Sequence, residues 1–291
     1  MRAPLLPVIV AAAAAAACGG DDRVTVCSKN FTESILLGEI VAQQLEDAGM
    51  AVDRRFNLGG TFVCHEALIA GQVDAYVEYT GTAYSAVLKL PPERDPARVR
   101  AAVDSAYRER WDVVWTEALG FENTFAILVR GSDARRLGLT TLSQAVPHAR
   151  AWRPGFGYEF TERADGFRGL VAAYALEFAA PPAEMDLGLV YRALASGEVD
   201  LIAGNSTDGQ IAALDLTHLE DDRRYFPPYQ AVPVIRAAVL ERFPAARAAL
   251  AALGGSLDET AMRHLNYLVD VEKRSVREVA AEWRAHQKTR T

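Results

Sequence analysis

The residues whose types suggest chemistry most directly are Cys64 and His65, a thiol beside an imidazole base. Neighbouring side chains on a helix point about 100° apart, so these two cannot face each other. A catalytic cysteine normally meets its base through the fold instead. The sequence also has no G-x-S-x-G nucleophile elbow and no H-E-x-x-H pair. We therefore expect a protein that is not an enzyme and that uses no cofactor.

Two acidic pairs, Asp21-Asp22 and Asp221-Asp222, are the next candidates. Such pairs are most often solvated turns, and because no zinc-finger spacing accompanies them we assign no metal site. The formal net charge is −7, with 31 basic against 38 acidic side chains. An acidic chain without basic runs is a poor candidate for nucleic acid, whose phosphates need neutralising. Half of the 291 residues are hydrophobic, which excludes a disordered chain, and the length suggests two domains.

The first seventeen residues are typical of an export signal, with one positive charge at Arg2, an apolar run and a small-residue end. The run is too short to span a membrane. Cys18 follows Ala-Ala and precedes Gly, which resembles a lipobox, although Ala15 stands where that pattern prefers Leu. We expect residues 1–17 to be a cleaved signal peptide and Cys18 to be a lipid anchor. Soluble periplasmic export and a buried alanine helix are the alternatives.

Two further cysteines, Cys27 and Cys64, should lie near the ends of neighbouring strands. Export would permit a disulfide between them. Two small buried thiols are the other interpretation, and the pattern leaves both open.

Alternating strands and helices position these residues. Periodicity and glycine stops predict strands over 23–28, 51–57 and 73–78, with helices from Thr32 to Gly49 and over 62–70. This spacing predicts a parallel α/β sheet with helices on its faces. After about residue 125 we expect strands at TFAILVRG and GEVDLIAG, a helix over 168–179 and a helical tail over 244–285.

An internal repeat links the two halves of the chain. HEALIAGQVDAYVEYT (65–80) aligns without gaps on YRALASGEVDLIAGNS (191–206), with Ala, Leu, Gly, Val and Asp shared. Each copy predicts a helix end, a glycine stop, an acidic turn and a buried strand, and hence two similar lobes. Coincidence between two generic turns is the alternative. If the repeat is real, Tyr79 and Asn205 are equivalent, at the strand ends where open α/β sheets bind ligands.

An ordered series of motifs resembles one protein family. The series is SKNFTE, EYTGT, GFENTFAILVR, ERADG, STDGQI and FPPYQAVPVIR. It is similar to the glycine betaine/choline/carnitine type of ABC-importer substrate-binding protein. The resemblance implies an α/β, type II periplasmic-binding-protein fold, with two α/β lobes that close on a ligand cleft. It implies lobe one at residues 22–125 plus 227–291 and lobe two at 126–226.

The resemblance also implies which residues bind the ligand. Lys29 and Thr82 would lie near the ligand on lobe one, and Tyr79 and Tyr229 would be aromatic walls around its cation. Arg163 would reach the carboxylate from lobe two when the lobes close. Aromatic faces suit a quaternary ammonium, and an arginine fork suits a carboxylate. A buried core tyrosine at 79 and a surface arginine at 163, paired with Asp165 or Glu162, are the alternatives.

Two positions depart from the family pattern. Phe125 stands where betaine-binding members often have tyrosine, and Asn205 stands where a fourth cage tyrosine is common. Asparagine offers an amide but no π face. A larger or more polar zwitterion, such as carnitine, a choline derivative or ergothioneine, is therefore as plausible as glycine betaine.

These patterns together predict a monomeric periplasmic or cell-envelope receptor that captures a quaternary-amine or zwitterionic solute for an ABC permease. A receptor for another zwitterion such as an amino acid, or a sensory binding module, is the alternative. An enzyme of the same fold is the least favoured interpretation, although a few enzymes do use it.

Overall fold

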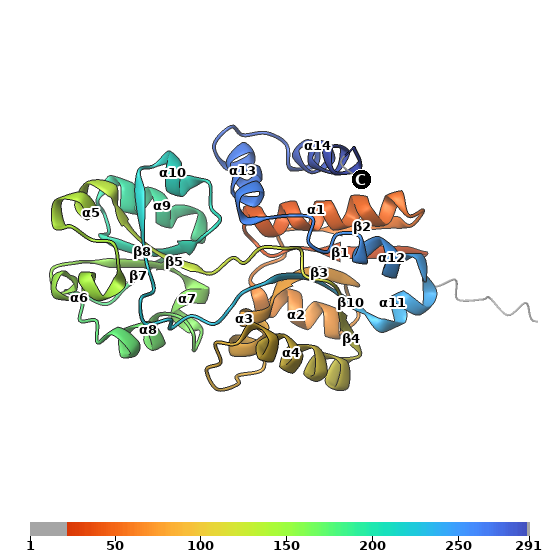
Figure 1. Cartoon of the computed structure of the whole chain (residues 1–291), viewed down its shortest axis with the longest axis horizontal. Coiled ribbons are helices and arrows are strands. Elements are labelled where there is room, and N and C mark those ends of the chain that lie inside the picture. Colours follow the sequence, from red (N-terminus) through yellow and green to blue (C-terminus); the bar gives the residue numbers. More distant parts are fainter. Residues whose placement is uncertain (1–21, 290–291) are drawn as a thin grey trace, which may run out of the picture.

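The structure, a computed structural model that describes residues 22–289, contains two β-sheets flanked by helices (Figure 1). The first sheet has the strand order β2-β1-β3-β10-β4, and the second has the order β7-β6-β8-β5-β9. We call the body around the first sheet lobe one and the body around the second sheet lobe two. The predicted signal peptide at 1–17 and Cys18 lie outside the described residues.

Two separate segments build lobe one. The first contains β1 (Arg23–Cys27), α1 (Thr32–Asp47), β2 (Ala51–Arg55), α2 (Thr61–Ile69), β3 (Ala75–Tyr79), α3 (Thr80–Thr82), the π-helical η1 (Ala83–Val87), α4 (Pro96–Trp111) and β4 (Val113–Trp115). The second contains β10 (Ala231–Arg236), α11 (Ala237–Arg242), α12 (Ala245–Ala251), α13 (Glu259–Asp270) and α14 (Val276–Lys288).

Lobe two is built from the segment between these two. Its elements are β5 (Phe125–Arg130), α5 (Gly131–Leu137), α6 (Leu142–Ala149), β6 (Pro154–Gly157), α7 (Tyr158–Glu162), α8 (Phe167–Tyr174), β7 (Ala183–Met185), α9 (Leu187–Ser196), β8 (Leu201–Asn205), α10 (Gln210–Ala213) and β9 (Leu216–Leu219). The chain therefore crosses between the sheets twice, after β4 and after β9. The lobe limits given above, at residues 125 and 226, stay predictions.

Each sheet is mixed rather than parallel, which corrects the prediction of a parallel sheet. In lobe one β1 pairs in parallel with β2 and β3, but β10 is antiparallel to β3 and β4. In lobe two β5 is likewise antiparallel to β8 and β9. Both reversed strands directly follow a crossing. The crossing chain reaches each sheet on the side where the carboxyl ends of its other strands lie. The strand that begins there, β10 or β5, therefore runs antiparallel to its neighbours.

The internal repeat corresponds to two turns of the same construction. Before β3, Asp74 accepts from the Thr25 N–H at 2.8 Å and pairs with Arg236 at the end of β10. Before β8, Asp200 accepts from the Arg153 N–H at 3.0 Å and pairs with Arg130 at the end of β5. The glycine in each turn, Gly71 or Gly197, has a left-handed φ of +71° or +79°. The predicted equivalence of the two segments is therefore confirmed.

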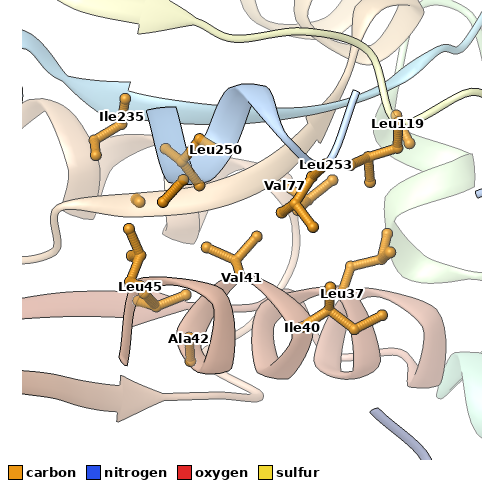
Figure 2. Close-up of a cluster of buried hydrophobic side chains, with 14 of the residues drawn as sticks. Leu37, Ile40, Val41, Ala42, Leu45, Val77, Leu119, Ile235, Leu250 and Leu253 are labelled. Carbon is orange, nitrogen blue, oxygen red and sulfur yellow. The ribbon is translucent and has the colours of Figure 1, made fainter. Parts of the chain in front are cut away.

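Helix α1 is a central part of the hydrophobic core of lobe one. Figure 2 shows Leu37, Val41 and Leu45 of α1 facing Val77 of β3 and the helix that carries Leu250. Eleven of the sixteen residues of α1 are buried, because the sheet packs on one side of the helix and α12, α13 and α14 pack on others. The C-terminal helices α13 and α14 pack on the same helix and hold its start next to lobe two.

Local backbone geometry explains where the predicted boundaries differ. The helix expected over 168–179 ends at Tyr174, because Ala175 is left-handed with a φ of 54°. The strand expected over 51–57 ends at Arg55, two residues before the left-handed Asn57. Cys27 and Cys64 are buried free thiols, as in the second interpretation. A hydrogen bond with Cys64, together with burial, raises the pKa of the Cys27 thiol.

Candidate functional site

A cavity of about 440 Å³ lies between the two lobes. Its lining comes from the ends of β1, β3 and β8, from the starts of α2, α7 and α9, and from both crossing segments. All seven predicted ligand-binding residues line it: Lys29, Tyr79, Thr82, Phe125, Arg163, Asn205 and Tyr229. The strand ends of both sheets thus meet at one site.

Lys29 contributes a charge that is already paired. It follows β1, is 2% exposed, and donates from Nζ to Glu78 Oε1 at 2.5 Å and to Thr61 Oγ1 at 3.0 Å. Glu78 is fully buried and also accepts from the Tyr76 hydroxyl at 2.9 Å. A buried cation needs such a partner, since an unpaired one would carry a large desolvation cost. Lys29 therefore presents a neutralised pair to the cavity rather than a free positive charge.

Arg163 forms the corresponding pair on lobe two. It is 5% exposed, which excludes the surface-arginine alternative, although its pairing with Asp165 is present. Nε and Nη2 donate side-on to the two Asp165 oxygens at 2.8 and 2.6 Å. Tyr229 donates its hydroxyl to the same carboxylate at 2.6 Å. Burial opposes the charged form, but the charge and hydrogen bonds of Asp165 raise the pKa of the Arg163 guanidinium overall.

The side-on pair leaves one guanidinium nitrogen for the cavity. Among residues 22–289 the only hydrogen-bond partner of Arg163 Nη1 is Thr82 Oγ1, at 3.4 Å. Nη1 carries two N–H groups, so at least one can still donate. Thr82 belongs to lobe one, and this contact therefore joins the two walls of the cavity.

Three of the aromatic residues that line the cavity, Tyr79, Phe125 and Tyr229, are predicted to bind the ligand. Phe125 is edge-on to Tyr229 with ring centroids 5.9 Å apart, and Tyr79 lies 6.2 Å from Phe31. The Tyr229 ring packs closely because position 81 is glycine, where a Cβ would lie 2.6 Å from a ring carbon. Lys29 Nζ lies 5.2 Å from the Tyr79 ring centroid, and Arg163 Cζ lies 4.9 Å from the Phe125 ring centroid, so two of the rings already contact a cation of this chain. Aromatic faces attract a cation without needing a hydrogen bond from it.

Tyr79 also donates its hydroxyl to Glu33 at 2.6 Å and is 4% exposed. It is therefore a buried tyrosine with a satisfied hydroxyl, as one alternative expected, and a cavity wall as well. Burial and the adjacent Glu33 charge raise the pKa of the Tyr79 phenol well above its usual value.

Asn205 ends β8 directly opposite Phe125 in the strand register. Its side-chain amide donates to Asp208 Oδ2 at 3.1 Å, and its backbone N–H lies 3.1 Å from the Tyr191 hydroxyl. The amide therefore lines the cavity in a fixed orientation. No π surface replaces the tyrosine that the family pattern has here.

Two buried carboxylates, Glu33 and Glu78, were missed by sequence reasoning. Glu33 accepts four hydrogen bonds, from Tyr79, Asn123, Thr207 and Asn266, at 2.5–3.1 Å. Burial raises its pKa, and the four donors oppose that rise. Glu33 and Glu78 are the acidic members of SKNFTE and EYTGT, so the motifs contained the signal.

Comparison with known proteins places the chain in one family. The profile of the family described as "Substrate binding domain of ABC-type glycine betaine transport system" matches residues 22–286. The ergothioneine transport permease/ergothioneine binding protein EgtU of Helicobacter pylori (strain G27) is 35% identical over 89% of this chain and 47% of that protein. The chain thus spans about half the length of this relative.

Two other matches cover nearly whole chains. The carnitine transport binding protein OpuCC of Listeria monocytogenes serotype 1/2a (strain 10403S) is 32% identical over 90% of this chain and 86% of its own. A crystal structure of a glycine betaine/carnitine/choline ABC transporter is 30% identical with a TM-score of 0.75, over 91% of this chain and 99% of that one. The predicted two-lobed α/β fold is therefore confirmed.

Proposed function

Since the chain belongs to the family of substrate-binding domains of ABC-type glycine betaine transport systems, we propose that its cavity captures a zwitterion with a quaternary ammonium group. The observation that carries the proposal is the meeting of Tyr79, Phe125 and Tyr229 with Arg163 in one cavity. The family is one of transport substrate-binding proteins. Aromatic rings and a paired arginine suit reversible binding of a solute, which agrees with that role.

The aromatic walls hold the cationic end of the ligand. A trimethylammonium group cannot donate a hydrogen bond, so ring faces are its best partners, each giving about 0.5–2 kcal/mol depending on desolvation. Phe125 keeps a π face without the hydroxyl of the family tyrosine. Glu33 and Asp165 accept from the hydroxyls of Tyr79 and Tyr229, so both rings are held in place before the ligand arrives.

Arg163 holds the carboxylate end through Nη1. Asp165 fixes the guanidinium plane and Tyr229 fixes Asp165, so the donor is oriented before the ligand arrives. Lys29, which the resemblance places near the ligand, is a second candidate for the carboxylate. The Glu78 partner makes Lys29 the weaker candidate, and its role is to shape the lobe-one wall beside Thr61.

Ligand binding then favours the closed arrangement of the lobes. The cage draws on Tyr79 of lobe one, whereas Arg163 belongs to lobe two, so one ligand contacts both walls. A ligand that binds the closed form better than the open form shifts the population toward closure. The permease would receive the solute from that form.

Carnitine- or ergothioneine-like ligands fit this cavity better than glycine betaine alone. A cavity of about 440 Å³ falls within the roughly 300–1,000 Å³ usual for drug-sized ligands. Asn205 adds an amide at the fourth side, where it can bond a ligand hydroxyl or ring nitrogen. Relatives named for carnitine and for ergothioneine support the same choice.

The protein would act outside the cytoplasm, as substrate-binding components of ABC importers do. No helix within residues 22–289 is long and apolar enough to cross a membrane. We propose a periplasmic or envelope monomer, anchored through lipid on Cys18 after removal of residues 1–17, with an ABC permease as partner. Mass spectrometry of the mature amino terminus would detect the lipid directly.

A thermal-shift screen tests the proposed function. A ligand that binds only the folded state raises the melting temperature in a concentration-dependent way. We expect responses to glycine betaine, carnitine, ergothioneine or choline and none to ordinary amino acids. A response to an amino acid with silence across all quaternary amines would contradict the proposal, and turnover of any ligand would indicate an enzyme.

A further inference from the structure

We propose that the mouth of the cavity is a second subsite, which takes an uncharged apolar or aromatic substituent carried by the quaternary-amine zwitterion. Phe62, Val63, Tyr158 and Leu187 form it. The inference rests on the proposed function, because it assigns the part of the same ligand that extends beyond the aromatic cage. It makes these residues determinants of specificity, and it favours substituted betaines over glycine betaine itself.

Exposed apolar side chains gather at this mouth. Within residues 22–289 the exposed large hydrophobic residues are Leu58, Phe62, Val63, Tyr158 and Leu189, at 39–57%. Phe62, Val63 and Tyr158 line the cavity directly. Leu58 and Leu189 do not belong to the cavity lining. Such a concentration is uncommon on a soluble protein and marks a surface that is covered in function.

The inner part of the cavity differs sharply from the mouth. Tyr79, Tyr229 and Arg163 are 1–5% exposed and supply the partners for the cation and the carboxylate. A small betaine held by these groups would leave the outer rings in water. A substituent that continues outward would cover them, and it is continuous with the inner site because both line one cavity.

The mouth stays open although the lobes already touch. The Thr61 N–H at the start of α2 donates to Glu159 Oε1 of α7 at 2.7 Å. Gly60, the N-cap of α2, supplies no side-chain cap, so this carboxylate from the other lobe caps the helix. The bond holds the two helix starts at a fixed separation. Phe62 and Tyr158, the neighbours of the bonded residues, line the cavity and stay 40% and 57% exposed.

The charge of the rim restricts the substituent further. Three acidic side chains, Glu159, Glu162 and Asp186, belong to the cavity lining beside the residues of the mouth. A substituent that ends in a carboxylate would be repelled there, while a neutral chain or ring would not.

Calorimetric titration of the wild-type protein with a matched ligand series tests the subsite. We would use L-carnitine, acetyl-L-carnitine, hexanoyl-L-carnitine and glutaryl-L-carnitine. Each buried methylene should tighten binding by up to about fourfold, so hexanoylcarnitine should bind at least about tenfold tighter than acetylcarnitine. Glutarylcarnitine should bind more weakly than hexanoylcarnitine.

The double variant Phe62→Ala/Tyr158→Ala should bring the hexanoyl-to-acetyl affinity ratio close to one. Leu189→Ala is the matched control, since Leu189 is 52% exposed but does not line the cavity, and it should keep the ratio. Equal or falling affinity with chain length in the wild type would overturn the subsite while leaving the proposed function intact. Failure to bind any quaternary amine, glycine betaine and choline included, would overturn both.

Discussion

The two lobes end at the cavity through the same turn but present different walls. Asp74 in lobe one and Asp200 in lobe two each accept from a backbone N–H of the neighbouring strand segment and pair with an arginine, Arg236 or Arg130. Beyond the turns the chemistry diverges. The lobe-one wall carries Lys29 paired within its own lobe, whereas the lobe-two wall carries an arginine that reaches across.

The charged pairs of the two walls therefore differ in how far they depend on the other lobe. Lys29 follows β1 and Glu78 lies on the adjacent strand β3, so this pair lies wholly within lobe one. The Arg163–Asp165 pair is completed by Thr82 and Tyr229, which lie outside lobe two. We infer that the lobe-one wall contributes mainly stability and that the lobe-two wall makes affinity depend on closure.

The largest expected effect is on the lobe-one pair. Glu78→Ala would leave the Lys29 ammonium buried without a counterion. Breaking a buried pair in this way costs about 3–5 kcal/mol. We expect the free energy of unfolding, measured by urea denaturation, to fall by that amount.

Glu177→Ala is the control for this change. Glu177 pairs with Arg150 at 2.7 Å, but both side chains are exposed. Its loss should cost less than about 1 kcal/mol. Similar losses for the two variants would remove the distinction between the buried pair and a surface pair.

Asp208 extends the comparison to a buried carboxyl of lobe two that has no cationic partner among residues 22–289. It accepts from the hydroxyl of Tyr191 and the amide of Asn205. Burial, with the nearby charges of Glu33 and Asp270, raises its pKa to about 7. An unfolded aspartate has a pKa near 3.9, so the folded state binds the proton more tightly.

The stability that Asp208 contributes is therefore present at low pH and is lost as the pH rises toward 7. The slope is on the order of 1.4 kcal/mol per pH unit between the two pKa values. Asp208→Asn should flatten urea-denaturation stability between pH 5 and pH 7 relative to wild type. Asp215→Asn, at an exposed pair with Arg135, should not change the profile. Parallel profiles for Asp208→Asn and wild type would rule out the raised pKa.

Arg163→Met tests whether the lobe-two wall binds the ligand carboxylate. Removing a charged hydrogen-bond donor costs about 2 kcal/mol or more, so calorimetry should show glycine betaine or carnitine binding at least about thirtyfold more weakly. Choline has no carboxylate, and the freed Asp165 would still attract its cation, so its affinity should hold or rise. Equal losses for both ligands would mean that Arg163 does not bind the carboxylate.

The smallest expected effect is on the bond between the lobes at the mouth. Glu159→Gln keeps an acceptor for the Thr61 N–H but loses the charge at the helix start, worth about 0.3–1 kcal/mol. Ligand affinity should weaken by up to about fivefold, because the closed form is less stable. Glu184→Gln, at an exposed position of lobe two, is the control. A loss no larger than that of the control would deny the bond a role in closure.

The residues that line the cavity could be predicted from the sequence better than the hydrogen bonds and ion pairs behind them. Tyr79 and Asn205 could be located because the repeat places both at strand ends, and the structure puts both in the cavity. Glu33, Glu78 and Asp165 stood in the same motifs, but a motif does not show which side chain pairs with which. The direction of β10 and β5 depends on the crossings, which hydrophobic alternation does not encode.

The aromatic cage is tested most directly by calorimetric titration of a quaternary amine into two variants of one residue. Tyr79→Phe and Tyr79→Leu both lose the hydroxyl that bonds Glu33, but only phenylalanine keeps a π face. We predict that Tyr79→Phe binds choline or carnitine at least about 1 kcal/mol, or roughly fivefold, more tightly than Tyr79→Leu. Equal affinity in the two variants would contradict recognition of the cation by this ring.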